Sequence, residues 1–331
     1  MSNKKKICVI GGGAIGGIVA AILKKNEHDV CLLVRNKEHA KEIKEKGLNI
    51  TGHCGSIHVQ IPAYCVVTNL KKRPDIILMA TKAPEMPDAI RSILPLIPEE
   101  TLVVSLQNGI VEEELASIAG KNRTVGCVVG WGATLHSSTE MEMTSSGEFV
   151  IGYLDMEADG RIRELAEILS KILPVTISQD ILLHLYSKLI INSCISTVGA
   201  ICGLTLGKMM SKRSYRNLFH DIIREAIEVA KAMDWQIPPY AGKLDYYKLL
   251  EWSTFRQHIF LILFGFKYRK LKSSSLQSLE RGRKTEVRYF NGYIAKKGRE
   301  FKVATPVNDR MVELVEEIEN GKRQISQENL N

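Results

Sequence analysis

A glycine-rich turn near the start of the chain constrains the fold more than any other feature. The short apolar run Ile7–Ile10 leads into Gly11, Gly13 and Gly16 with G-x-G-x-x-G spacing, and a small, apolar stretch with helical spacing follows. The first glycine permits a tight turn, the second lets the backbone approach a pyrophosphate, and the third lets helix and strand pack closely. The helix N-terminus offers N–H groups and a positive dipole end to phosphates. This order of strand, turn and helix predicts a dinucleotide-binding unit.

A nucleotide site is not the sole interpretation of this stretch. Glycine-rich turns also occur in loops that bind nothing, and Lys4-Lys5-Lys6 before an apolar run can begin a secretory signal peptide. The apolar run is too rich in glycine for a signal core, and no clear cleavage site follows it. The next apolar strand, Asp29–Val34, begins where a βαβ unit would place it, which favours the nucleotide.

Length, charge and cysteine usage further limit the class of protein that the chain can belong to. The chain has 331 residues, enough for two domains, and a net charge of +8. The basic residues are spread among acidic ones, so we predict a solvated surface and no nucleic-acid partner. Seven cysteines, mostly in apolar runs and without a C-x-x-C pair, predict reduced thiols and a cytoplasmic location.

Neither a metal site nor a membrane span is expected. The segment Gly52–His58 holds two histidines and a cysteine but lacks a spaced second ligand pair, so a strand and turn are the better interpretation. The most apolar run, Ile181–Leu206, carries His184, Lys188 and Asn192, which suits a buried helix better than a membrane span. We therefore expect no membrane partner.

Polar side chains follow the predicted strands of the first domain. Arg35 comes directly after the second strand, where NAD-binding sites usually have an acidic residue; an arginine there suits the 2′-phosphate of NADP, although a surface arginine is the alternative. Lys82 follows the strand Asp75–Ala80, and Asn108 follows the strand Thr101–Leu106. Ligands of such sheets bind beyond the carboxyl ends of the strands, so these residues are predicted at the cofactor site.

The remaining pattern predicts two domains. Residues 48–67 predict short strands, and the other elements expected before Gln179 are the helices Lys37–Lys46, Pro87–Leu94 and Asp159–Leu173 and the strands Thr124–Val129, Glu148–Tyr153 and Val175–Ile177. Beyond Gln179 long helical periodicities continue to the end. The sequence predicts an α/β fold, with a Rossmann-type domain at 1–178, a boundary near Ser178, and an all-helical domain at 179–331.

The first helix of the second domain, expected at Ile181–Ser196, combines an apolar surface with one polar stripe. His184, Lys188, Asn192 and Ser196 recur at every fourth position. At about 100° per residue, each step drifts by only about 40°, so these side chains share one face. An ordinary amphipathic helix is the alternative. The other faces are too apolar for a surface helix, and a buried lysine is costly, so we predict that the stripe lines a cleft.

Two more helices are expected near the C-terminus. Ser273-Ser274-Ser275 is predicted to cap a helix that runs towards Lys297 and ends at Gly298, with Glu286 on it. The last helix, Asn308–Asn320, has the periodicity of amphipathic packing.

Several short motifs keep a fixed order along the chain. They are Gly11-Gly12-Gly13-Ala14-Ile15-Gly16, Val34-Arg35, Lys46-Gly47-Leu48, Ala80-Thr81-Lys82-Ala83, Leu106-Gln107-Asn108-Gly109-Ile110, Lys188-x-x-x-Asn192, Arg283-Lys284-Thr285-Glu286 with Asn291-Gly292, and Thr305-Pro306-x-Asn308. Each motif is weak alone. Together they resemble the ketopantoate reductase (2-dehydropantoate 2-reductase) family over nearly the whole length.

This resemblance implies NADPH as cofactor and reduction of a 2-oxo acid, ketopantoate, to its 2-hydroxy acid, pantoate, in pantothenate and coenzyme A biosynthesis. By resemblance, Lys188 is the proton donor and Glu286 holds hydroxyls of substrate or cofactor. Burial should lower the pKa of Lys188 towards neutrality. The implied cofactor-binding residues are Gly11, Gly13, Ala14, Ile15, Gly16, Arg35, Lys82 and Asn108, and the implied substrate-binding residues are Asn108, Asn192, Ser196 and Ser274.

Two positions depart from the family pattern. Ser196 stands where family members commonly have asparagine, and Ser278 where they often have aspartate. A different branched 2-oxo acid, an imine, or an NADPH-binding regulatory role without turnover therefore stay open. The stretch His258–Lys272 matches no family motif, and the oligomeric state is open, a homodimer included.

Overall fold

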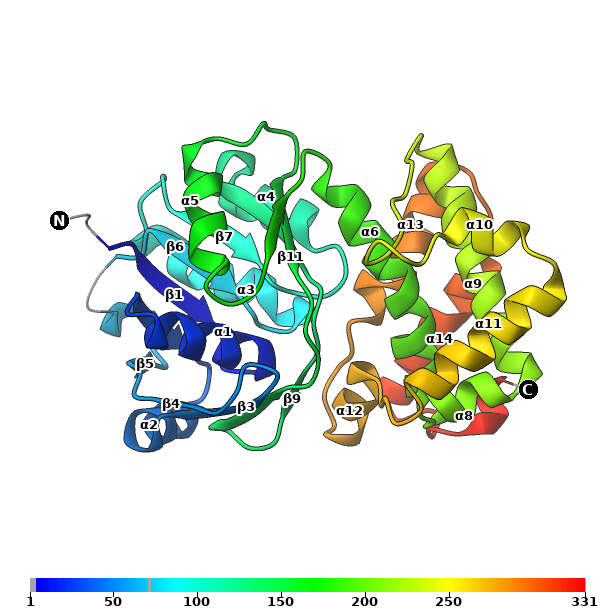
Figure 1. Ribbon diagram of the computed structural model, residues 1–331, viewed down its shortest axis with the longest axis horizontal. Coiled ribbons are helices and arrows are strands. Elements are labelled where there is room, and N and C mark those ends of the chain that lie inside the picture. Colours follow the sequence, from blue (N-terminus) through cyan, green and yellow to red (C-terminus); the bar gives the residue numbers. More distant parts are fainter. Residues whose placement is uncertain (1–3, 71–72, 331) are drawn as a thin grey trace. The chain divides into compact units, whose positions relative to one another are not determined.

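The chain divides into two units, Met1–Leu182 and Leu183–Asn331, in a computed structural model that describes residues 4–70 and 73–330 (Figure 1). The division falls inside one helix, Ile181–Asn192. The sequence-based boundary near Ser178 lies in the connection just before that helix and stays a prediction.

An eight-stranded sheet forms the centre of the first unit, with the order β12-β11-β8-β7-β6-β1-β2-β5. Its strands are β1 (Lys6–Ile10), β2 (Asp29–Leu33), β5 (Ala63–Tyr64), β6 (Ile76–Met79), β7 (Leu102–Ser105), β8 (Thr124–Val129), β11 (Phe149–Tyr153) and β12 (Val175–Ile177). Neighbouring strands are parallel, except that β11 runs antiparallel to β8. The chain leaves β1 for β2 on one side and returns to β6 on the other, so the sheet has its topological switch point at the carboxyl ends of β1 and β6.

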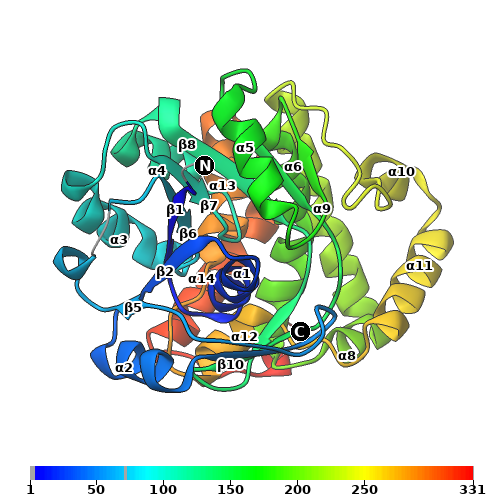
Figure 2. The same ribbon diagram turned by 60° about the vertical axis from the view of Figure 1, so that its left-hand side comes forward.

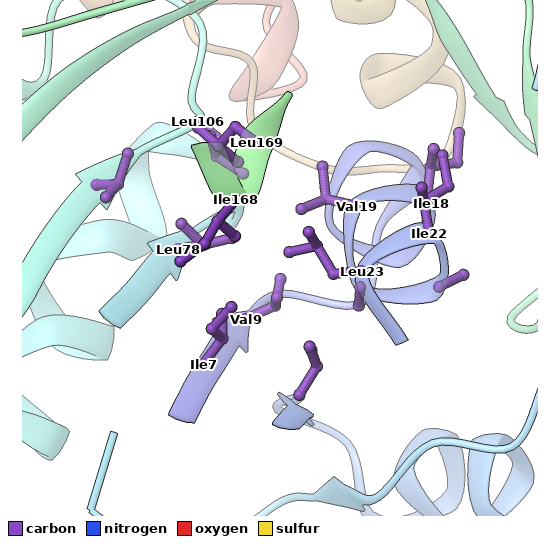
Figure 3. Packing of buried hydrophobic residues seen from close by; sticks show 14 of the residues in the cluster. Ile7, Val9, Ile18, Val19, Ile22, Leu23, Leu78, Leu106, Ile168 and Leu169 are labelled. Carbon is purple, nitrogen blue, oxygen red and sulfur yellow. The ribbon is translucent and has the colours of Figure 1, made fainter. Parts of the chain in front are cut away.

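Five α-helices accompany this sheet in the described residues of the first unit. They are α1 (Ala14–Lys25), α2 (Lys37–Lys46), α3 (Met86–Ile93), α4 (Glu112–Ala119) and α5 (Gly160–Leu169). Val19 and Leu23 of α1 lie against Ile7 and Val9 of β1 in the buried cluster of Figure 3. Fully burying each such side chain stabilises the fold by about 1.5–3 kcal/mol. This packing holds the start of α1 next to the end of β1, as the Rossmann-type prediction requires, and it confirms that fold class.

Two expectations about helices in the first unit need correction. The predicted helix Asp159–Leu173 is too long, because α5 ends at Leu169. Pro174 follows, and a residue before proline is disfavoured in helical conformation. The helix α4 was missed altogether, although its first turn carries three glutamates, as suits a helix N-terminus.

A second sheet of four strands, in the order β4-β3-β10-β9, lies in the same unit. Its strands are β3 (Leu48–Gly52), β4 (Ile57–Val59), β9 (Ala133–Leu135) and β10 (Glu140–Met143). The short strands expected within residues 48–67 are confirmed, but β9 and β10 were missed. The alternation Glu140-Met141-Glu142-Met143, with both methionines buried, is the period-two signal that could have revealed β10.

The second unit is built from helices, as predicted. They are α6 (Ile181–Asn192, its first two residues in the first unit), a π-helical segment (Ser193–Thr197), α7 (Val198–Cys202), α8 (Leu206–Ser211), α9 (Arg213–Ala232), α10 (Tyr246–Glu251), α11 (Thr254–Lys267), α12 (Ser274–Glu280), α13 (Asn291–Glu300) and α14 (Pro306–Glu319). The continuous helix Ile181–Cys202 is long and apolar enough to cross a membrane by length and composition. However, 67% of its most apolar window is buried inside the fold, which agrees with the predicted buried helix.

The single helix expected from Ser273–Ser275 to Gly298 is wrong. The chain forms α12 and α13 instead, and Gly282 ends α12 with φ +64°. Its N–H donates to Leu279 O and that of Arg283 to Ser278 O, the hydrogen bonds of a Schellman motif. Gly282 is the sequence signal from which the end of α12 could have been predicted.

Gly298 does not end α13 either. The helix continues to Glu300, and Lys302 takes the left-handed conformation at its end with φ +59°. The reason for glycine at 298 is close packing, because a Cβ there would lie 2.7 Å from Thr305 Cγ2.

Candidate functional site

The glycine turn after β1 has the geometry that a dinucleotide fingerprint needs. Gly11 has φ +110°, and a Cβ on it would lie 2.7 Å from the carbonyl carbon of Ala80, at the end of β6. A Cβ on Gly16 would collide with Gly11 O, so glycine lets α1 start close to the strand. By contrast, the space beside Gly13 is open for 4 Å, which leaves room for a pyrophosphate.

The start of α1 is suited to an anion. Gly13 is its N-cap, no side chain caps the helix, and no acidic residue occupies the first turn. The N–H groups at a helix start have no partner within the helix, and the helix dipole adds partial positive charge there. Ala14 and Ile15 open this helix, so the residues present fit the phosphates of a dinucleotide.

The loops after β6 and β7 lie at the same edge of the sheet as the glycine turn. Lys82 and Asn108 follow these two strands, as predicted, and both side chains are half-buried. The Gln107 side chain joins the loops, because its Nε2 donates to both the carbonyl and the hydroxyl oxygen of Thr81 at 3.0 Å. Within the described part of the chain, Gln107 Oε1 is buried without a hydrogen-bond partner. The sequence-based prediction gave Gln107 no such role, although its place at the end of a strand was visible.

Arg35 follows β2 at this edge, and its side chain is 80% exposed. Its Nη1 lies 3.1 Å from Glu85 Oε1 in the short helical turn Ala83–Glu85 after Lys82. A surface ion pair of this kind contributes about 0–1 kcal/mol, so it can open at little cost. The guanidinium is therefore available to another anion.

In the second unit, the polar stripe of α6 runs into the π-helical segment. His184, Lys188 and Asn192 are half-buried, and Ser196 is 6% exposed. Hydrogen bonds from i to i+5 put more residues in each turn than an α-helix has, so a four-residue step rotates less there. The step from Asn192 to Ser196 thus offsets the drift of the preceding α-helical steps. Such π segments are frequent at functional sites.

A buried polar network braces the π-helical segment. Thr197 Oγ1 donates to Asn291 Oδ1 at 2.5 Å, and Asn291 Nδ2 donates to Ser193 O at 3.4 Å and to Asn308 Oδ1 at 2.9 Å. Asn308 Nδ2 in turn donates to Glu225 Oε2 at 2.7 Å. Both asparagines are 0% exposed. Asn291 and Asn308, which the sequence had left without a role, therefore support the helix that carries Lys188.

Further hydrogen bonds fix α6 beside Lys188. The Tyr186 hydroxyl donates to Ala226 O at 2.8 Å, and Ser187 Oγ donates to Pro238 O at 2.8 Å. The Tyr246 hydroxyl donates to Ser187 O at 2.7 Å. Burial raises the pKa of both tyrosines, so they stay neutral donors. These bonds fix α6 just before Lys188, and the polar network around the π-helical segment fixes the helix after it.

Serines connect α12 with the polar stripe. Ser273 Oγ accepts from Leu276 N at 3.1 Å, and so caps α12, and it donates to Ser196 O at 3.2 Å. Ser274 is the first residue of α12 and half-buried, and its carbonyl accepts from Ser278 Oγ at 3.0 Å. Both departures from the family pattern, Ser196 and Ser278, therefore bond to the Ser273–Ser274 turn.

Glu286 does not lie on a long helix, contrary to expectation. It is 3% exposed and begins the short helical turn Val287–Tyr289, in the connection between α12 and α13. Its carboxylate is thus held inside the second unit, where a charge needs partners.

Among residues 4–70 and 73–330, no group of three or more His, Cys, Asp or Glu side chains is arranged to hold a metal ion. All seven cysteines lie among these residues, and none of them forms a disulfide.

The fold and the sheet edge define a Rossmann-type protein with a helical second unit, and comparisons with known proteins place it more closely. Residues 7–156 match the family model described as ketopantoate reductase PanE/ApbA, and residues 180–319 match the model of its C-terminal part. The chain belongs to the ketopantoate reductase family, and it is an oxidoreductase of that family.

Individual relatives are distant but span nearly the whole chain. A 2-dehydropantoate 2-reductase of Archaeoglobus fulgidus is 26% identical over 318 residues, which cover 96% of this chain and 99% of the relative. Two solved structures share the fold, each with a TM-score of 0.82 and covering 96% of this chain and 99% of the other. They are a D-mandelate dehydrogenase with NADH and anilino(oxo)acetate, 24% identical, and a ketopantoate reductase from Ralstonia eutropha JMP134, 23% identical.

Proposed function

We propose that this protein reduces 2-dehydropantoate to pantoate with NADPH, in the cytoplasm, as a step of pantothenate and coenzyme A biosynthesis. The observation that carries the proposal is the half-buried Lys188 in the polar stripe of a braced, mostly apolar helix, in a chain whose two units both match the ketopantoate reductase family. Relatives that span more than nine tenths of the chain carry the name of this activity.

The first unit would hold the cofactor. The turn Gly11–Gly16 would take the pyrophosphate, with Ala14 and Ile15 offering N–H groups at the start of α1. Lys82 and Asn108 would contact the cofactor at the same edge, and Asn108 the substrate as well. Arg35 would meet the 2′-phosphate with a charge-assisted contact. Bound NADPH would supply the hydride that the reduction needs.

The second unit would hold the 2-oxo acid and supply a proton. Addition of a hydride to the C2 carbonyl leaves negative charge on its oxygen, and Lys188 Nζ would donate the proton that makes the hydroxyl. Asn192, one turn further along α6, would orient the ammonium or the substrate. Ser196 and Ser274 would bind substrate oxygens, and the Glu286 carboxylate would offset the lysine charge and accept from the new hydroxyl.

A second candidate substrate follows from Ser196 and Ser278. Both serines are smaller than the residues that are common in the family, and the backbone carbonyl of Ser196 and the hydroxyl of Ser278 bond to Ser273 and Ser274. Smaller side chains here would widen the substrate pocket, which would then accept another branched 2-oxo acid, or an imine, in place of 2-dehydropantoate.

The test is NADPH oxidation by the purified protein with a panel of 2-oxo acids and one cyclic imine. Turnover highest with 2-dehydropantoate supports the proposal, and turnover highest with another member supports the second candidate. Tight NADPH binding with no turnover on any compound would overturn both and indicate a regulatory NADPH-binding protein.

A further inference from the structure

One face of α11 is apolar and exposed along its whole length. Phe255, Ile259, Ile262, Leu263 and Phe266 are 74%, 41%, 45%, 63% and 68% exposed. At about 100° per residue, these five side chains fall within an arc of about 100° and form one stripe. A contiguous apolar patch on a folded protein marks an interaction surface, whereas single exposed residues do not.

The opposite face fixes the orientation of this helix. Gln257, Leu261 and Gly265 are buried there. A Cβ on Gly265 would collide with the side chain of Met210 in α8, so the two helices are in close contact. Gln257 Nε2 donates to the carbonyl oxygens of Leu249 and Trp252, at 3.1 and 3.0 Å. Because the opposite face of α11 packs against the second unit, the apolar stripe faces outward. The helix lies at the outside of that unit (Figure 2).

Four of the five residues of the stripe, all except Leu263, are arranged symmetrically in the sequence. Phe255, Ile259, Ile262 and Phe266 are spaced by four, three and four residues, so the order Phe, Ile, Ile, Phe is the same from either end. When two such helices pack antiparallel about a two-fold axis, Phe255 of one copy faces Phe266 of the other, and Ile259 faces Ile262. A two-fold interface requires this reciprocity, in which residue i contacts j and j contacts i.

We propose that the apolar stripe of α11 is a two-fold symmetric contact with a second copy of this chain. The aromatic ends and aliphatic centre match the composition of interface cores, from which charges are depleted. This inference concerns the second unit alone and does not depend on the proposed reaction.

Charges around the stripe make the contact depend on salt. Between Trp252 and Leu279 the chain has no acidic residue, and it carries the bases Arg256, Lys267, Arg269, Lys270 and Lys272, of which Lys272 is paired with Glu280 at 2.5 Å. Antiparallel packing brings the basic end of one α11 near the exposed Glu251 of the other copy, but that single acid does not balance the bases. The remaining like charges repel across the contact, and salt screens them. The dimer should therefore tighten as salt is added, whereas binding to an anionic surface would weaken.

The experiment is sedimentation equilibrium of the full chain over a dilution series at low and high salt. We expect a dimer whose dissociation constant falls with salt. Ile262→Asp should raise this constant roughly a hundredfold or more, because each dimer contains the change twice. The control is Phe301→Asp, with the same charge change on a residue that is 45% exposed in the same unit, and it should leave the constant unchanged. The thermal unfolding of both variants should match that of the unmodified chain.

A second measurement tests the antiparallel register. Ile259→Cys mixed with Ile262→Cys should give a covalent dimer under oxidation much faster than either variant alone. A chain that stays monomeric at every concentration, or a dimer that Ile262→Asp leaves intact, would overturn the proposal. Monomers that bind anionic vesicles in a salt-sensitive way would also overturn it, and would assign the stripe to a lipid surface.

Discussion

Arg35 and Glu85 form an ion pair, with 3.1 Å between Nη1 and Oε1, across the carboxyl edge of the eight-stranded sheet. Arg35 follows β2, and Glu85 lies in the turn that comes after β6, so the pair joins the connections from the two strands that flank β1. The glycine turn begins at the end of β1. Arg35, which is predicted to select NADPH, is thus already paired with the carboxylate of Glu85.

Removing the arginine should reduce the preference for NADPH. A charge-assisted hydrogen bond contributes about 1.5–3 kcal/mol, so Arg35→Ala should raise the KM for NADPH about 10- to 100-fold. The KM for NADH, which lacks the 2′-phosphate, should hardly change. Initial rates with both cofactors check this, and equal use of NADH and NADPH by the unmodified protein would contradict it.

Removing the acid should have the opposite effect. Glu85 competes with a 2′-phosphate for the guanidinium, and its own surface pair with Arg35 is weak. Glu85→Gln should therefore lower the KM for NADPH by a factor of about two to five. The matched control is Asp88→Asn, the same change of charge one turn further on, which should not alter this KM. An unchanged KM in Glu85→Gln would show that the pair does not compete.

Lys188 should be required for turnover and not for folding. A general acid contributes about 10²–10⁴ in rate, so Lys188→Ala should lose turnover on that scale with the best 2-oxo acid. Its NADPH affinity and thermal midpoint should stay near those of the unmodified protein. Lys208→Ala, an exposed lysine on α8, serves as control. Near-normal turnover in Lys188→Ala would exclude this lysine as the proton donor.

Two neighbouring serines should separate substrate binding from stability. Ser274→Ala should raise the KM for the 2-oxo acid and leave NADPH affinity unchanged. Ser273→Ala should instead lower stability by about 1 kcal/mol, because it removes the cap of α12 and the bond to Ser196 O. Steady-state kinetics and thermal unfolding of both variants distinguish the roles. Equal loss of both affinities in Ser274→Ala would make that serine structural.

Asp159 should stabilise the first unit in a pH-dependent way. Burial opposes its charge, but hydrogen bonds from Arg161, Ile162 N and the Tyr153 hydroxyl lower its pKa from 3.8 to about 2. A pKa lowered by folding adds stability above pH 3.8, and this stability is lost as the pH falls towards 2.

Asp159→Asn isolates this charge, because asparagine can still cap α5. Since the carboxylate is 36% exposed, solvent screening reduces the expected cost to about 1 kcal/mol at neutral pH. Thermal unfolding from pH 7 down to pH 2 measures it, and the gap between the variant and the unmodified protein should close at the acid end. A gap that is independent of pH would contradict the assignment.

Much of the first unit follows from local sequence. The glycine fingerprint and the apolar strands predict the Rossmann-type sheet, because backbone sterics and side-chain periodicity act over a few residues. Arg35, Lys82 and Asn108 could be placed at one edge from sequence, since the carboxyl ends of parallel strands meet there. The helix end wrongly predicted at Gly298 shows the limit of prediction from local sequence, because a glycine can allow close packing as well as end a helix.

Only the tertiary structure decided the features that depend on distant partners. The π-helical segment at Ser193–Thr197 is braced by Asn291 and Asn308, about a hundred residues away, and no local pattern encodes that pairing. The strands β9 and β10 exist because β10 pairs with β3. The apolar stripe of α11 was readable as a sequence, but its exposure follows from the contact of Gly265 with Met210. Local propensity fixes which residues can share a face, and long-range packing fixes where that face points.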